Sequence, residues 1–159
     1  MSSPPPHFTP GSLYIAGFAQ ARAPHLALII PKDAQSGSLV HIRIDRSASP
    51  TWQYEHRRQK IQGDMFFSSL MKIHDFATGD ITVNQLCEAA SAVPVPDNDQ
   101  FGECGPWVFK TIEKLHEMGV LTLVDVVALE KEFGVFAEGN RAYARRDRFP
   151  NVAVSLHCT

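Results

Sequence analysis

The first half of the chain alternates short apolar runs with polar, turn-forming segments, which is typical of a β-sheet. Residues 25–30 (HLALII) stand between Pro24 and Pro31, the length and setting of a buried strand. In residues 39–44, Val40, Ile42 and Ile44 alternate with Leu39, His41 and Arg43, so the two sets face opposite sides of a sheet. Three more segments predict strands in a meander: 13–18, 52–56 and 65–73.

After Gly79 the pattern changes to helices. Thr82 and Gln85 have the spacing of a capping box and predict a helix that stops before Pro94. A second helix should run from Cys104 to Gly119, and a third should start near Thr122, with Asp125 completing its capping box. A final strand is expected at 152–156. We therefore predict an α+β fold, with an antiparallel sheet of about four to five strands packed against two to three helices.

The length of the chain and the composition of its N-terminal residues predict a single domain after a short arm. A chain of 159 residues fits a single hydrophobic core. Residues 1–11 are rich in proline and small polar residues and should form a disordered arm, leaving 12–159 as the folded domain. The N-terminus lacks a secretory pattern, and no run approaches the ~20 apolar residues of a membrane span, so we expect a cytoplasmic protein. The sequence says nothing of oligomeric state.

The charge balance argues against nucleic acid as a partner. The formal net charge is −2, so no overall field attracts phosphate backbones. Four arginines near the C-terminus are the local exception, and we interpret them as a solvated helix face rather than an anion site; they are Arg141, Arg145, Arg146 and Arg148.

Cys104 is the candidate nucleophile. The chain has three cysteines, an odd number without close spacing, so a disulfide framework and a zinc knuckle are not expected. Cys104 opens a predicted helix and lies on its inward stripe, where the helix dipole favours the thiolate. Gly105 leaves room for a substrate, although Pro106 removes one backbone donor. The alternative is a buried cysteine that packs as a small hydrophobe; Cys87 and Cys158 lack the helix-terminal setting.

A thiol nucleophile needs a base, usually a histidine oriented by a third polar group. Among seven histidines, His25 begins a buried strand and His41 interrupts an apolar run on the next one. Each can also be an ordinary histidine at a strand end or surface. No pair among His25, His41 and Cys104 has the spacing of a zinc motif, so we expect neither a metal nor a cofactor.

The order of three motifs carries a family resemblance: His25-Leu-Ala-Leu-Ile-Ile, then Leu39-Val-His41-Ile, then Cys104-Gly-Pro-Trp-Val. It resembles the circularly permuted papain-like fold of the lecithin retinol acyltransferase family and its NlpC-type relatives. The resemblance implies Cys104 as nucleophile, His25 as base and His41 as the orienting third member, with Gly105 and Trp107 beside the oxyanion and substrate. The chain also resembles small fungal proteins, some of them encoded beside natural-product pathways.

Two departures from these families bear on activity. Glu103 stands where they usually have asparagine, and an acidic neighbour would raise the cysteine pKa. Gly105 and Pro106 replace a polar or acidic pair. We expect a cysteine-dependent hydrolase or acyltransferase acting on an amide, ester or thioester of a small molecule or peptide. Two alternatives stay open: a non-catalytic binding or accessory protein with this fold, and a tailoring enzyme such as a cyclase that uses His25 as acid or base.

Overall fold

One six-stranded sheet forms the centre of the protein, in the order β4-β3-β2-β1-β5-β6. The computed structural model describes residues 8–145 and 147–159. Neighbouring strands are antiparallel except β5 and β6, which are parallel, so the sheet is mixed and has more strands than the four to five expected. The strands are β1 (Leu13–Phe18), β2 (His25–Pro31), β3 (Ser36–Arg43), β4 (Gln53–Lys60), β5 (Phe67–His74) and β6 (Asn151–Val154).

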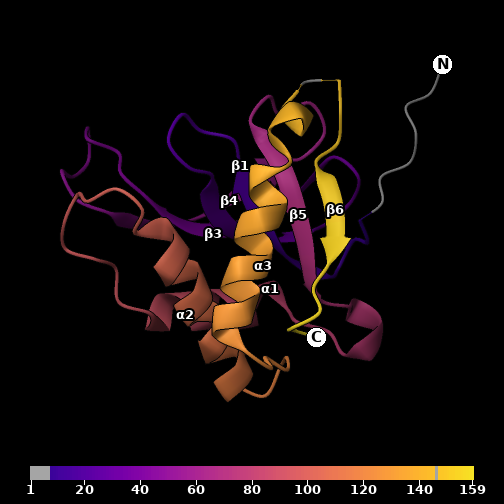
Figure 1. The fold of residues 1–159 in the computed structure, drawn as a ribbon. Coiled ribbons are helices and arrows are strands. Elements are labelled where there is room, and N and C mark those ends of the chain that lie inside the picture. The colour runs from indigo at the N-terminus through magenta and orange to yellow at the C-terminus, as the bar shows by residue number, and fades with distance from the viewer. Residues whose placement is uncertain (1–7, 146) are drawn as a thin grey trace.

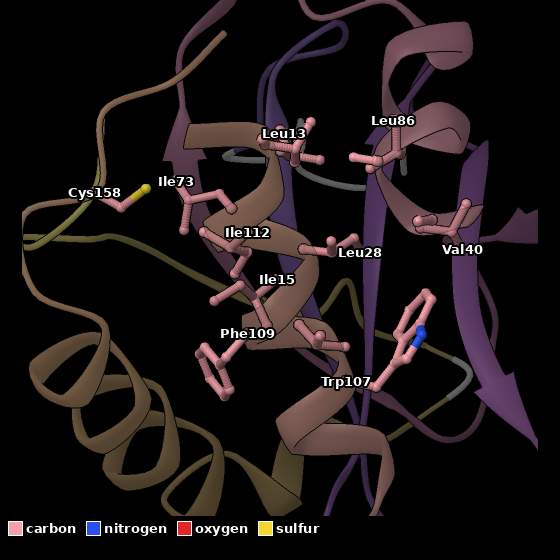
Figure 2. Close-up of a cluster of buried hydrophobic side chains, with 14 of the residues drawn as sticks. Leu13, Ile15, Leu28, Val40, Ile73, Leu86, Trp107, Phe109, Ile112 and Cys158 are labelled. Carbon is pink, nitrogen blue, oxygen red and sulfur yellow. The ribbon is translucent and has the colours of Figure 1, made fainter. Parts of the chain in front are cut away.

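Three helices pack on one face of this sheet, which confirms the α+β prediction. They are α1 (Val83–Ala92), α2 (Cys104–Glu117) and α3 (Val126–Glu138), with short 3₁₀ helices η1 (Phe76–Thr78) and η2 (Arg141–Tyr143). Figure 1 shows α2 and α3 in front of the sheet. In Figure 2, Leu28 and Val40 from the strands lie close to Ile112 and Trp107 of α2, all within the larger apolar core. None of the helices in the described ranges is long and apolar enough to cross a membrane.

The opposite face of the sheet carries a second, smaller core, as the alternation in 39–44 requires: Val40 joins the core under the helices and Leu39 the other one. Phe8 is buried in this second core, and the Thr9 amide donates a 2.7 Å hydrogen bond to the Tyr14 hydroxyl. Residues 8–11, which we assigned to the disordered arm, therefore belong with the folded domain. Residues 1–7 of that arm lie outside the described part of the chain.

The helix starts follow the capping chemistry in one case and depart from it in another. At α1 the capping box is confirmed: the Gln85 amide donates to the Thr82 hydroxyl, and the Gln85 side chain accepts from the Thr82 amide. At α3 the prediction of a box beginning at Thr122 is wrong. Asp125 is itself the N-cap and accepts from the Ala128 amide, while the Thr122 backbone pairs with Thr159.

This contrast gives a matched pair of variants. Thr82→Ala should lower the free energy of unfolding by about 1 kcal/mol, because one helix-start amide loses its acceptor. Thr122→Ala, at a threonine that caps no helix, should cost less than about 0.5 kcal/mol. Urea unfolding curves of the two variants measure both values, and equal losses would contradict the assignment of the caps.

The arginines near the C-terminus do not form the helix face we expected, because α3 ends before them. Arg141 lies in η2 and donates to a backbone carbonyl, Arg145 pairs with a neighbouring carboxylate, and Arg148 lies over the Tyr143 ring. Arg146 lies outside the described residues.

Candidate active site

A chain of hydrogen-bonded side chains crosses three neighbouring strands on the face of the sheet away from the helices. Nε2 of His25 on β2 lies 2.8 Å from Nδ1 of His41 on β3, and Nε2 of His41 lies 2.9 Å from Oε1 of Glu55 on β4. His41 and Glu55 are direct cross-strand partners in the β3–β4 register. The sheet therefore fixes the order of the three groups.

Glu55 is the charged end of this chain. Burial raises its pKa, but the hydrogen bond from His41 and the charges of Arg43 and Arg57 outweigh burial and hold the pKa below its usual range. Nε of Arg43 lies 2.9 Å from Oε2, and Nη1 of Arg57 lies 3.3 Å from Oε1. The Glu55 side chain is therefore an ionised acceptor at neutral pH.

An ionised carboxylate determines the tautomer of both imidazoles. Burial, followed by the coulombic effects of His41 and Arg57, lowers the pKa of His25 to about 4, and burial also lowers the pKa of His41, so both rings are neutral at neutral pH. Nε2 of His41 must donate to Glu55, which leaves its Nδ1 to accept from Nε2 of His25. Nδ1 of His25 then carries a lone pair, and no partner for it is found among the described residues.

Cys104 is the first residue of α2 and packs into the core beneath it, on the same stripe as Val108, Ile112 and Leu115. Burial raises the pKa of its thiol, and the backbone N–H groups of Leu26, Gly105 and Cys104 itself only partly oppose this. We expected the helix start to favour the thiolate, but the effect of burial on the thiol pKa is larger than that of the helix-start N–H groups.

Glu103, which we expected to raise the cysteine pKa, is not among the causes of the raised value. It is the N-cap residue of α2, and its side chain makes no capping hydrogen bond.

His25 lies where two cavities meet. It lines a cavity of about 360 Å³ together with Cys104 and Gly105, and a second cavity of about 560 Å³ together with His41. It is the first residue of β2, at the end of the strand. No hydrogen bond joins Sγ of Cys104 to an imidazole within the described chain. The two side chains therefore share a cavity without a direct bond in this state.

Trp107, expected beside the substrate, lies instead in the core under α2 (Figure 2). It is 1% exposed, its ring centroid lies 6.0 Å from that of Tyr54, and it is not among the residues that line the two cavities. The helix periodicity explains this: Trp107 is three residues after Cys104 and follows it onto the inward face.

Glu55, Arg43 and Arg57 are the site residues that the sequence analysis missed. The signal for Glu55 was present, because alternation in the predicted strand 52–56 separates it from Trp52, Tyr54 and His56. Placing it opposite His41 needs the register of the β3–β4 hairpin, whose connection runs from residue 44 to 52. No three metal-binding side chains in the described ranges are grouped so as to hold an ion.

The depressed pKa of His25 makes folding depend on pH. The unfolded chain binds a proton at His25 below about pH 6.5, whereas the folded chain resists it until about pH 4, so stability is lost as pH falls through this window. The loss from this group is on the order of 3 kcal/mol. Unfolding in urea across the window should show a shallower pH dependence for His25→Gln, and an unchanged one for His56→Gln at an exposed position of β4. Identical slopes for His25→Gln and the wild type would refute this assignment.

Comparison with known proteins adds one finding. No curated protein and no solved structure matches the chain. A family model described as a family of unknown function, DUF6540, matches residues 13–122. The matched region holds β1 to β5, α1 and α2, and so includes His25, His41, Glu55 and Cys104, whereas α3 and β6 lie outside it. The chain belongs to the DUF6540 family.

Proposed function

We propose that this protein is a cysteine-dependent hydrolase or acyltransferase that acts on an amide, ester or thioester of a small molecule or peptide. One observation carries the proposal. The hydrogen bonds from His25 to His41 and from His41 to Glu55 leave the Nδ1 lone pair of His25 free to act as a base, and His25 lines the same cavity as Cys104. A nucleophile, a base and a group that orients the base are the parts that covalent acyl transfer requires.

The reaction would proceed in two halves. Sγ of Cys104 attacks the acyl carbon while Nδ1 of His25 takes the thiol proton, and the carbonyl oxygen becomes an oxyanion. The backbone N–H groups of Cys104 and Gly105 are donors suited to this oxyanion, since Pro106 has none. The intermediate collapses, and His25 returns the proton to the leaving group. Water or an acceptor then attacks the acyl-cysteine, His25 takes its proton, and the thiol is regenerated.

The resting state in this mechanism is a neutral pair rather than a thiolate and an imidazolium. Burial raises the pKa of Cys104 and lowers that of His25 to about 4, so proton transfer accompanies attack. Turnover should consequently persist to a lower pH than an ordinary histidine base allows, and decline only toward pH 4 as His25 is protonated.

The fold proposed with this chemistry is the permuted papain-like one. Support comes from the order of elements: the base on β2, the orienting histidine on β3, and the cysteine at the start of a later helix that packs on these strands. The resemblance to fungal proteins encoded near natural-product pathways leads us to propose a role in such a pathway.

The proposal is tested with p-nitrophenyl butyrate as the probe, in the presence and absence of an amine acceptor. Wild-type protein should release nitrophenolate and, with the amine, form the amide. His25→Ala should lose this activity, and His56→Ala, which alters an exposed histidine on β4, should keep it. Equal rates for the wild type and His25→Ala would reject His25 as the base.

A binding or accessory protein is the second candidate, favoured by the raised pKa of Cys104 and by the absence of a hydrogen bond from its sulfur to an imidazole within the described residues. If the protein is a binder, Cys104 should not react with iodoacetamide and the protein should not turn over an acyl probe. A cyclase is distinguished by its variants, because Cys104→Ser would be tolerated while His25→Ala would not.

A further inference from the structure

The cavity shared by Cys104 and His25 is lined mainly by apolar residues. Its walls come from β2, α2, α3 and the segments before β2, β4 and α2. Its volume of about 360 Å³ is within the range of small-molecule sites. Apart from Cys104 and His25, Glu130 is the only ionisable side chain among its described lining residues. The apolar walls are Leu26, Trp52, Phe101, Pro106, Phe109 and Phe133.

Gly134 keeps one side of this cavity open. It lies within α3, where a glycine weakens the helix relative to alanine. A Cβ atom added at this position would meet no heavy atom within 4 Å. Gly134 also lines an adjoining cavity of about 300 Å³, together with Ala23 and Pro24. A larger side chain at 134 would therefore occupy space that continues outward from the cysteine cavity.

We propose that this cavity binds the acyl group of the substrate, that the group is uncharged and apolar, and that Gly134 sets how long it can be. The inference rests on the proposed function, in which the acyl carbon is attached to Sγ of Cys104. The chain extending from that carbon then meets Leu26 and the aromatic walls, where each buried methylene strengthens binding. A terminal carboxylate would lose its hydration and find no cationic side chain among the described lining residues.

The test uses n-alkyl iodoacetamides from ethyl to decyl at mildly alkaline pH, with alkylation followed at each cysteine by peptide mass spectrometry. At Cys104 the half-saturating concentration should fall by up to about fourfold for each methylene buried, until the tail outgrows the cavity. Cys87, which is not among the lining residues of this cavity, should show no such dependence in the same sample. A probe with a terminal carboxylate should lose the gain at Cys104.

Gly134→Leu should abolish the gain from the longer tails. Val135→Leu adds the same side chain at the next residue of α3, which is 67% exposed, and should behave as the wild type. Equal rates for all tail lengths, or no alkylation of Cys104 by any probe, would overturn the proposal. Because alkylation needs no acyl transfer, a protein that prefers long tails but turns over no ester would retain this site and lose the proposed function.

Discussion

Cys104→Ala is expected to abolish acyl transfer. Without Sγ no acyl-enzyme can form, and loss of the nucleophile in a serine protease lowers kcat on the order of 10⁶-fold. The substitution removes one small buried atom, so the fold should survive with a cost below about 2 kcal/mol. The measurement is the rate of nitrophenolate release from p-nitrophenyl butyrate, alongside a urea unfolding curve.

Cys87→Ala is the matched control, because Cys87 is a half-buried cysteine in the middle of α1. It should keep the wild-type rate. Full activity in a folded Cys104→Ala protein would reject Cys104 as the nucleophile. Loss of activity in Cys104→Ala together with loss of its structure would instead indicate a packing role for Cys104.

Glu55→Gln is expected to lower turnover strongly, although Glu55 is a positioning residue that acts through His41. Glutamine keeps the shape of the side chain but removes the charge, and its amide can donate to Nε2 of His41 and so reverse the tautomers of both rings. His25 would then present a proton instead of a lone pair at Nδ1. A comparable change in a serine triad costs about 10⁴-fold, and we expect a loss of about 10²- to 10⁴-fold in kcat.

A purely structural role for Glu55 would not change the imidazoles in this way. The ¹⁵N chemical shifts of His25 and His41 should report protons on Nε2 of both rings in the wild type and on Nδ1 in the variant. Asp45→Asn is the control, since Asp45 also pairs with Arg43, at 3.6 Å, but touches neither imidazole. Unchanged tautomers together with unchanged turnover in Glu55→Gln would contradict the proposed chain of hydrogen bonds.

Local patterns predicted most of the fold correctly. Alternation along 39–44 placed Val40 and Leu39 on opposite faces, and the structure buries each in a different core. The capping box at Thr82 was confirmed because it depends on four consecutive residues. The start of α3 was wrong, because Asp125 can complete a box or be the cap itself, and only the pairing of the Thr122 backbone with Thr159 decides between them.

Predicting the whole site would have required contacts between residues far apart in the sequence. His25 and His41 could be proposed from their places on two strands, but Glu55 becomes part of the site only through the register of β4 against β3. The pKa of Cys104 was misjudged for a similar reason. Its helix position was predicted correctly, whereas the burial that raises its pKa comes from packing against distant elements.

The central claim is that Sγ of Cys104 carries the acyl group and that His25 removes the proton of the Cys104 thiol. It is tested most directly by mixing the protein with p-nitrophenyl butyrate, quenching with acid and mapping the peptides by mass spectrometry. We expect a butyryl group on Cys104 that forms rapidly in the wild type and much more slowly in His25→Ala. A butyryl group at another residue, or equal rates of Cys104 acylation in the two proteins, would contradict it.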